Sequence, residues 1–128
     1  MKKENLNVLG AIILDSCITV HRELGPGLLE SAYSKALMKE IEIREIRAKF
    51  QVPIELNYKD APLGKVYIID ILVENEIILE IKSVEVLMPI FTAQVITYLK
   101  ISCKKLGYLI NFNVPLLKDG FKRIVHNF

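Results

Sequence analysis

The stretch Ile68–Ser83, with the sequence IIDILVENEIILEIKS, decides the fold of this chain. It contains two apolar runs separated by the polar residues 74–76, which is the pattern of a β-hairpin. The first run is apolar on both faces, as expected of a buried strand in the centre of a sheet. If the turn is centred on Asn75, Asp70 lies directly opposite Glu80, with Cβ atoms about 5 Å apart. Two carboxylates are then expected to share one face of an apolar sheet.

Lys82 follows Glu80 by two residues, and we therefore expect it on the same face. Directly opposed carboxylates repel each other, so a positive charge must compensate them. Mg²⁺ is usually bound by one or two carboxylates together with water and phosphate oxygens. The pattern favours a divalent-metal site over the alternative, a hairpin with ordinary surface charges. A register shifted by one residue would move Glu80 and Lys82 to the face opposite Asp70.

The remaining sequence predicts one α/β domain over residues 1–128, with a central mixed sheet flanked by helices in the order ααβββαββ. Lys59–Gly64 is predicted to be a turn, and Pro89 suits the first turn of the third helix. We expect the last strand at an edge of the sheet and the one before it in the centre. The predicted elements are helices Leu6–Leu24, Leu28–Ile46 and 89–102, and strands Phe50–Tyr58, Lys65–Val73, Ile77–Ser83, Leu106–Phe112 and Phe121–His126.

Composition describes a globular protein, because 52% of the residues are hydrophobic and 25% are charged. The apolar segment Val8–Val20 is shorter than the roughly 20 residues that span a bilayer, so we expect a core helix. No signal-peptide cleavage site follows it, and we expect the protein to stay in the cytoplasm. Cys17 and Cys103 lack the spacing of a zinc site and are predicted to be buried free thiols.

Charge is unevenly distributed although the net charge is only +2. Asp70–Glu85 contains five acidic residues and one lysine, whereas Lys100–Phe128 contains six basic residues and one aspartate. This is either ordinary solvated charge or a metal site flanked by side chains that contact phosphates. The candidates for phosphate contact are Lys104, Lys105, Lys122 and Arg123.

Two motifs carry a resemblance to a known family. Asp70, a nine-residue gap and then Glu80-Ile81-Lys82 resemble the PD-(D/E)xK signature of metal-dependent nucleases, with Ile69 in the place of the proline. Gly27–Tyr33, GLLESAY, resembles the motif that names the GxxExxY protein family, and residues 21–27, 94–98 and 107–112 are also similar to that family. The resemblance covers nearly the whole chain and implies a restriction-endonuclease-like core.

The resemblance also implies roles for individual residues. Asp70 and Glu80 are the metal-binding carboxylates, with the Ile81 carbonyl as a third ligand, and the metal is Mg²⁺ or Mn²⁺. Lys82 orients the attacking water and stabilises the transition state. Glu30, predicted on the same helix face as its apolar neighbours Tyr33, Leu37 and Ile41, is a further ligand or acts through a water. The alternative for Glu30 is stabilisation of the helix dipole.

Four further residues have both a functional and a structural interpretation. Gln94 and Tyr98 resemble the QxxxY element of recombination-type nucleases, and the alternative is a buried hydrogen-bonded pair; both interpretations place them facing inward. Tyr33 is either a core aromatic residue with a satisfied hydroxyl, which is favoured, or touches the site. His21 is either a hydrogen-bonded structural histidine, again favoured, or a metal ligand.

The predicted function is hydrolysis of phosphodiester bonds by a Mg²⁺- or Mn²⁺-dependent nuclease, with DNA favoured over RNA as substrate. One alternative is a nucleic-acid-binding or accessory module that keeps the fold without cleaving. Another is a protein-interaction domain in which the metal is structural. No membrane association is expected, and the oligomeric state stays open, with a homodimer among the alternatives.

Overall fold

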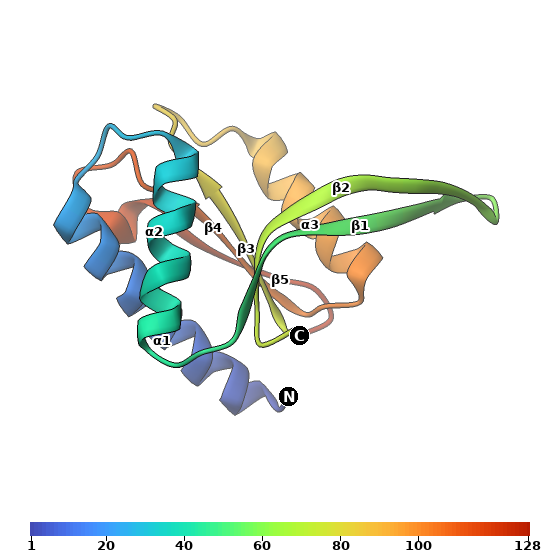
Figure 1. The fold of residues 1–128 in the computed structure, drawn as a ribbon. Coiled ribbons are helices and arrows are strands. Elements are labelled where there is room, and N and C mark those ends of the chain that lie inside the picture. The colour runs from blue at the N-terminus through green and yellow to red at the C-terminus, as the bar shows by residue number, and fades with distance from the viewer.

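A computed structural model describes the whole chain, residues 1–128, and has the predicted α/β architecture with one short 3-10 helix added (Figure 1). Most predicted boundaries are shifted by a few residues, since the ends of elements depend on capping and pairing. The elements are α1 Lys3–Leu24, α2 Glu30–Ile43, β1 Ala48–Tyr58, β2 Ala61–Val73, β3 Ile77–Lys82, α3 Pro89–Ser102, β4 Leu106–Asn111, η1 Leu117–Gly120 and β5 Phe121–Val125.

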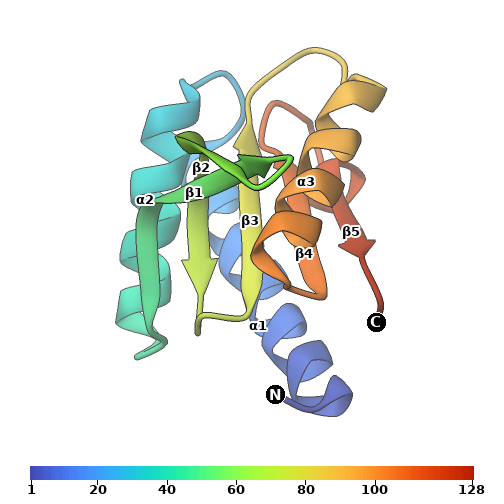
Figure 2. The same ribbon diagram turned by 90° about the vertical axis from the view of Figure 1, so that its right-hand side faces the viewer.

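The five strands form one mixed sheet in the order β1-β2-β3-β4-β5, in which only β3 and β4 are parallel. Helices α1 and α2 pack on one face, over a core that includes Ile13, Leu37 and Leu79. Helix α3 packs on the other face, over Ile78 and Leu99. Figure 2 shows α3 in front of the sheet and α1 behind it. Strand β4 is central and fully buried, and β5 lies at an edge, as predicted.

The hairpin between β2 and β3 has the predicted register. Ile71 pairs with Leu79, and the turn is centred on Asn75. Residues 74 and 75 are left-handed, with φ of 51° and 56°, which allows the chain to reverse within a short loop. The same register brings Asp70 and Glu80 opposite each other at the next position.

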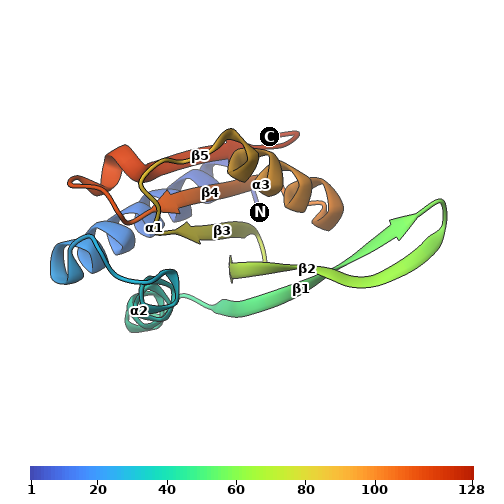
Figure 3. The same ribbon diagram turned by 90° about the horizontal axis from the view of Figure 1, so that it is seen from above.

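Strands β1 and β2 extend beyond the rest of the sheet as a two-stranded arm (Figures 1 and 3). The prediction of a turn over Lys59–Gly64 is wrong, because only Lys59 and Asp60 turn and β2 starts at Ala61. Their φ values of 48° and 64° are those of a tight two-residue hairpin. The expectation that β2 is buried is also wrong for Ile68, which is 55% exposed because no third strand lies beside the arm.

Both strands of the arm twist where they leave the sheet, so that their side chains change from one face of the sheet to the other. Ile71 packs in the core under α1 and α2, whereas Ile69, two residues earlier, packs in the core under α3. In β1, Ala48 packs against the first core and Val52 against the second. Residues separated by two or four positions in a regular strand share a face. The arm is therefore bent at the level of Asp70.

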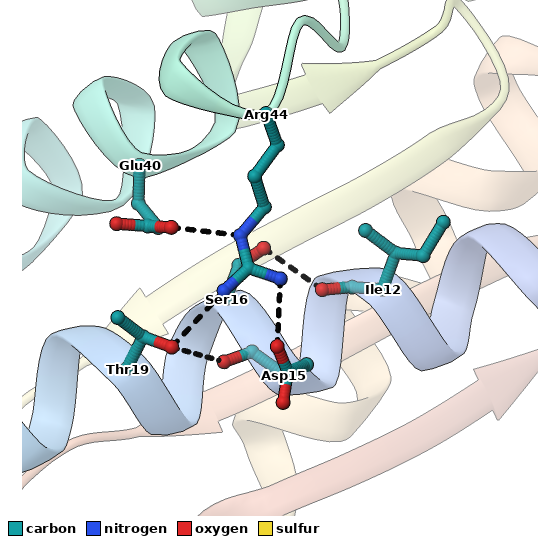
Figure 4. Close-up of polar contacts among 6 residues, drawn as sticks. All are labelled: Ile12, Asp15, Ser16, Thr19, Glu40 and Arg44. Carbon is teal, nitrogen blue, oxygen red and sulfur yellow. Dashed lines mark hydrogen bonds and ion pairs between the residues drawn. The ribbon is translucent and has the colours of Figure 1, made fainter.

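The Arg44 side chain joins α2 to α1 (Figure 4). Its guanidinium donates hydrogen bonds of 2.7 Å to Glu40 and to Asp15, and one of 3.0 Å to the Thr19 hydroxyl. Bonds between ionised partners are stronger than neutral ones. This cluster stabilises the contact between the two helices at the end of α2 opposite Glu30.

The two cysteines differ in their surroundings. Cys17 is buried in α1, and burial raises the pKa of its thiol. The prediction that Cys103 is buried is wrong: it follows the last residue of α3 in a left-handed conformation and is exposed. None of the helices combines the length and apolar character that crossing a bilayer requires.

Candidate metal-dependent active site

The candidate site lies where β2 and β3 separate. Their backbone pairing ends at Ile71 and Leu79. At the next position, side chains form the hydrogen bonds between the two strands. The Asp70 N–H donates to Glu80 Oε1 at 3.1 Å, and the Ile81 N–H donates to Asp70 Oδ2 at 2.8 Å. Each carboxylate thus accepts a backbone hydrogen bond from the opposite strand. The two carboxylates lie next to each other as a result.

The two carboxyl groups are buried or half-buried and lack a cationic partner. Glu80 is only 7% exposed, and burial followed by the charge of Asp70 raises its pKa to about 8. Burial also raises the pKa of Asp70, and the charge of Glu30 adds to that effect. None of the ion pairs of the protein involves either carboxylate. A positive ion at this position would stabilise the charged form of both groups.

Lys82 lies near the pair, but its ammonium is directed towards α3. The Nζ atom lies 4.5 Å from the centre of the Phe91 ring, a cation–π contact. Its charge still lowers the pKa of both Asp70 and Glu80. Lys82 is therefore an electrostatic neighbour of the carboxylates without forming an ion pair with them.

Glu30 is the first residue of α2 and is exposed, so it lies outside the core although its spacing places it on the helix face of Tyr33, Leu37 and Ile41. Those three side chains are buried, whereas the helix begins beyond the edge of the core. Glu30 instead lines an open cleft of about 420 Å³ together with Asp70. The second helix thus approaches the site from the side of the cleft.

Tyr33 is a core residue that fastens the loop before Glu30. It is fully buried, and its ring stacks on Phe112 with a centroid distance of 4.5 Å. Its hydroxyl donates to the Gly25 carbonyl and accepts a bond of 3.1 Å from the Leu28 N–H. The tyrosine of the GLLESAY motif therefore has a structural role, because it holds the loop that leads into α2 and to Glu30.

Gln94 and Tyr98 line an open cavity of about 280 Å³ between α3 and the arm. Tyr98 is buried, its ring lies 5.4 Å from that of Tyr67, and burial followed by the charges of Glu80 and Asp70 raises its pKa. The prediction that both residues face inward is wrong for Gln94, which is exposed. The charges of both carboxylates thus act on the Tyr98 hydroxyl.

His21 lies apart from the carboxylates. Its Nε2–H donates a bond of 2.7 Å to the Val114 carbonyl, and the residue is buried. It lines a different cavity, together with Arg22 and Lys118. This is the arrangement of a structural histidine.

The four basic residues predicted to contact phosphate do not gather around the pair. Lys104 and Lys105 precede β4, at the end of the sheet opposite Lys82. Lys122 and Arg123 lie on the edge strand β5 and extend to opposite faces, where they bond a threonine of α3 and an asparagine of α1 at 3.1 Å. The surplus of charge seen in the sequence is thus divided among several surfaces.

The donor set fits a hard divalent cation that keeps ligands from solvent or substrate. No group of three or more His, Cys, Asp or Glu side chains is close enough to hold a metal ion. Mg²⁺ needs only one or two carboxylates when water and phosphate oxygens complete its coordination. The Ile81 N–H faces Asp70, so the carbonyl of this strand residue points to the same side, where backbone pairing has ended.

Residues 7–124 match the PD-(D/E)XK nuclease superfamily, and the chain belongs to it. The five-stranded mixed sheet flanked by helices is consistent with the restriction-endonuclease-like fold of that superfamily. Membership indicates a nuclease-type function, for which members generally use divalent metals and nucleic-acid substrates. No curated protein and no solved structure gives a significant match to the chain.

Proposed function

We propose that this protein is a Mg²⁺- or Mn²⁺-dependent nuclease that hydrolyses phosphodiester bonds of DNA, and that it belongs to the GxxExxY branch of its superfamily. The observation that carries the proposal is the adjacent pair Asp70 and Glu80, two carboxylates with raised pKa values and no cationic partner. A structural pair of this kind costs stability, because burial and mutual repulsion both oppose ionisation. A divalent ion removes that cost.

Asp70, Glu80 and the carbonyl of Ile81 would hold the ion, with Glu30 as a further ligand directly or through a water across the cleft. When bound, the ion supplies an acidified water and neutralises charge on the phosphate. The two backbone N–H bonds at Asp70 and Glu80 keep the carboxylate oxygens oriented before any ligand arrives. Orientation in advance lowers the cost of binding.

Lys82 would orient the attacking water and stabilise charge that develops on the phosphate. Its Nζ lies over the Phe91 ring in this structure. The flexible four-carbon stem of lysine would allow the ammonium to turn towards the carboxylates by a change of rotamer. Tyr98 borders the same face, and Gln94 lies at its rim, where it would meet the nucleic-acid backbone. Lys104, Lys105, Lys122 and Arg123 would then add weak contacts to more distant phosphates.

The cation–π contact of Lys82 favours one second candidate, a module that binds nucleic acid without cleaving it. In such a module the ammonium would stay on Phe91 and no group would orient the water. Binding would then depend on salt, because phosphate contacts release counterions.

The deciding experiment incubates the protein with labelled single-stranded DNA, double-stranded DNA and RNA, in Mn²⁺, in Mg²⁺ and with chelator. We expect cleavage of DNA that depends on the metal and is lost in Asp70→Asn. Asp15→Asn is the matched control, because Asp15 pairs with Arg44 away from the site. Binding without cleavage in every metal would favour the second candidate, and neither binding nor cleavage would refute both.

A further inference from the structure

Gln51 is the one non-glycine residue within a strand of this protein that has a left-handed backbone conformation. Eight non-glycine residues have positive φ, and seven of them lie in turns or beyond the ends of elements. Gln51, with φ of 53°, lies inside β1. Glutamine gains nothing from this conformation, which glycine or asparagine adopts more readily. Strain of this kind persists only where the surrounding structure imposes it, and it is concentrated at functional sites.

The strained residue lies directly across from Asp70. Phe50 pairs with Ile71 and Val52 pairs with Ile69, so the same register places Gln51 opposite Asp70, a pair that is missing from the ladder. At this same position, the side chains of β1 and β2 change from packing in the core under α1 and α2 to packing in the core under α3. The left-handed residue therefore lies at the bend, at the level where β2 separates from β3 and Asp70 has no backbone pair.

The bend also brings the Gln51 side chain to the cleft shared by Glu30 and Asp70. Gln51 is exposed there, beside Ser31 and Lys35. The two carboxylates repel a phosphate, so a substrate at this cleft needs donors that face its oxygens. A glutamine amide offers two N–H donors and adds no charge that would compete with a cation at the carboxylates.

We propose that Gln51 is a substrate-positioning residue, whose side-chain amide donates a hydrogen bond to a phosphate oxygen of the nucleic acid beside Asp70. This inference rests on the proposed function. Irregular strand positions next to active sites commonly redirect one side chain, and here the redirected side chain is the amide. This role differs from that of Asp70, because Gln51 would bind the substrate and Asp70 would bind the metal. Substitution of Gln51 should therefore change substrate affinity without removing a metal ligand.

Three variants separate the side chain from the bend. Gln51→Gly keeps the left-handed backbone at no steric cost and removes the amide. Gln51→Glu keeps the size of the side chain and replaces the donors by a negative acceptor. The matched control is Asn57→Gly, which removes an exposed amide from the same strand outside the cleft.

Affinity for labelled DNA is measured by fluorescence anisotropy in Ca²⁺, and KM and kcat are measured in Mn²⁺. We expect Gln51→Gly to weaken binding and raise KM by about tenfold, since a bond to a charged group is lost, with kcat nearly unchanged. Gln51→Glu should weaken binding further and should bind Mn²⁺ no less tightly than the parent.

Unchanged DNA affinity and KM in Gln51→Gly, while the parent binds DNA, would overturn the inference and leave the proposed function standing. A loss in Gln51→Gly no larger than that in Asn57→Gly would overturn it as well, because a general effect of removing an amide from β1 would explain both. A parent that neither binds nor cleaves DNA would refute the proposed function and the inference together.

Discussion

Two acidic clusters in this protein are built in opposite ways. Around Arg44, the carboxylates of Asp15 and Glu40 each lie 2.7 Å from a guanidinium nitrogen. Between β2 and β3, Glu80 is buried and Asp70 half-buried, and neither forms an ion pair. The fold neutralises charge where two helices need only be held together. It leaves charge uncompensated at the place where we propose that a metal binds.

The largest expected effect concerns Lys82, the cation that the second cluster does not use as a partner. Lys82→Met keeps the apolar stem over Phe91 and removes the ammonium, so we expect the cleavage rate to fall by about 10²–10³-fold. Mn²⁺ affinity should be retained or increased, because a positive charge near the ion is lost. Single-turnover cleavage and titration calorimetry measure the two quantities. Arg44→Ala is the control and should keep kcat; equal rates in Lys82→Met and the parent would remove Lys82 from the reaction.

The next largest effect is a pH dependence of stability, which we expect from the Asp70–Glu80 cluster and not from the Arg44 cluster. The pKa of Glu80 is raised from 4.5 to about 8, so the folded protein holds a proton that the unfolded chain releases in this range. The stabilisation is complete below about pH 4.5 and is lost as the pH rises through about 8, on the order of a few kcal/mol without metal.

Urea unfolding of the metal-free protein at several pH values measures this dependence. Glu80→Gln should flatten the difference between low and high pH, because its amide does not titrate. Glu40→Gln, the control at the Arg44 cluster, should keep the slope of the parent, since it leaves Asp70 and Glu80 unchanged. A parent and a Glu80→Gln variant with the same slope would show that Glu80 ionises normally.

Metal binding should reverse the order of stability between a site variant and the parent. Without metal, Asp70→Asn removes one of two opposed charges and should be at least as stable as the parent, by a fraction of about 1 kcal/mol. With Mn²⁺ at 100 times Kd, the parent should gain about 2.7 kcal/mol and the variant little.

Thermal melts with and without Mn²⁺ report this reversal, and Asp15→Asn should retain the metal-dependent shift. Strong destabilisation of metal-free Asp70→Asn, together with no shift in the parent, would make Asp70 a structural residue of the core.

The smallest effect is expected at the neutralised cluster. Arg44→Ala should lower the free energy of unfolding by about 1 kcal/mol, since its partner Asp15 is largely exposed and surface ion pairs contribute little. The loss should be the same with and without Mn²⁺. A loss that changed with metal would mean that the two clusters are coupled through α2.

Several features of the site follow from local patterns in the sequence. Two apolar runs of similar length around Asn75 leave one register that keeps both runs buried, and that register brings Asp70 and Glu80 together. Pro89 begins α3 as predicted, because its missing N–H is not needed in a first turn. In these cases the deciding interactions are between residues close in sequence.

Other features were not predicted. Helical periodicity placed Glu30 with the core side chains but did not show that the core ends before it. The basic residues near the C-terminus are close in sequence, yet β5 alternates them between two faces. Gln51 was missed because no glycine or asparagine marks its left-handed position.

The sequence by itself determined the order of elements, the pairing of β2 with β3 and the adjacency of the two carboxylates, because alternation and turn chemistry act over a few residues. Only the tertiary structure decided that the arm bends at Gln51, that Lys82 rests on Phe91 and that Glu30 opens onto a cleft. These depend on how α2 and α3 pack against strands distant in the chain. This packing depends on the shape of two separate cores. Each core is formed by residues distant in sequence, so a pattern of a few neighbouring residues cannot predict it.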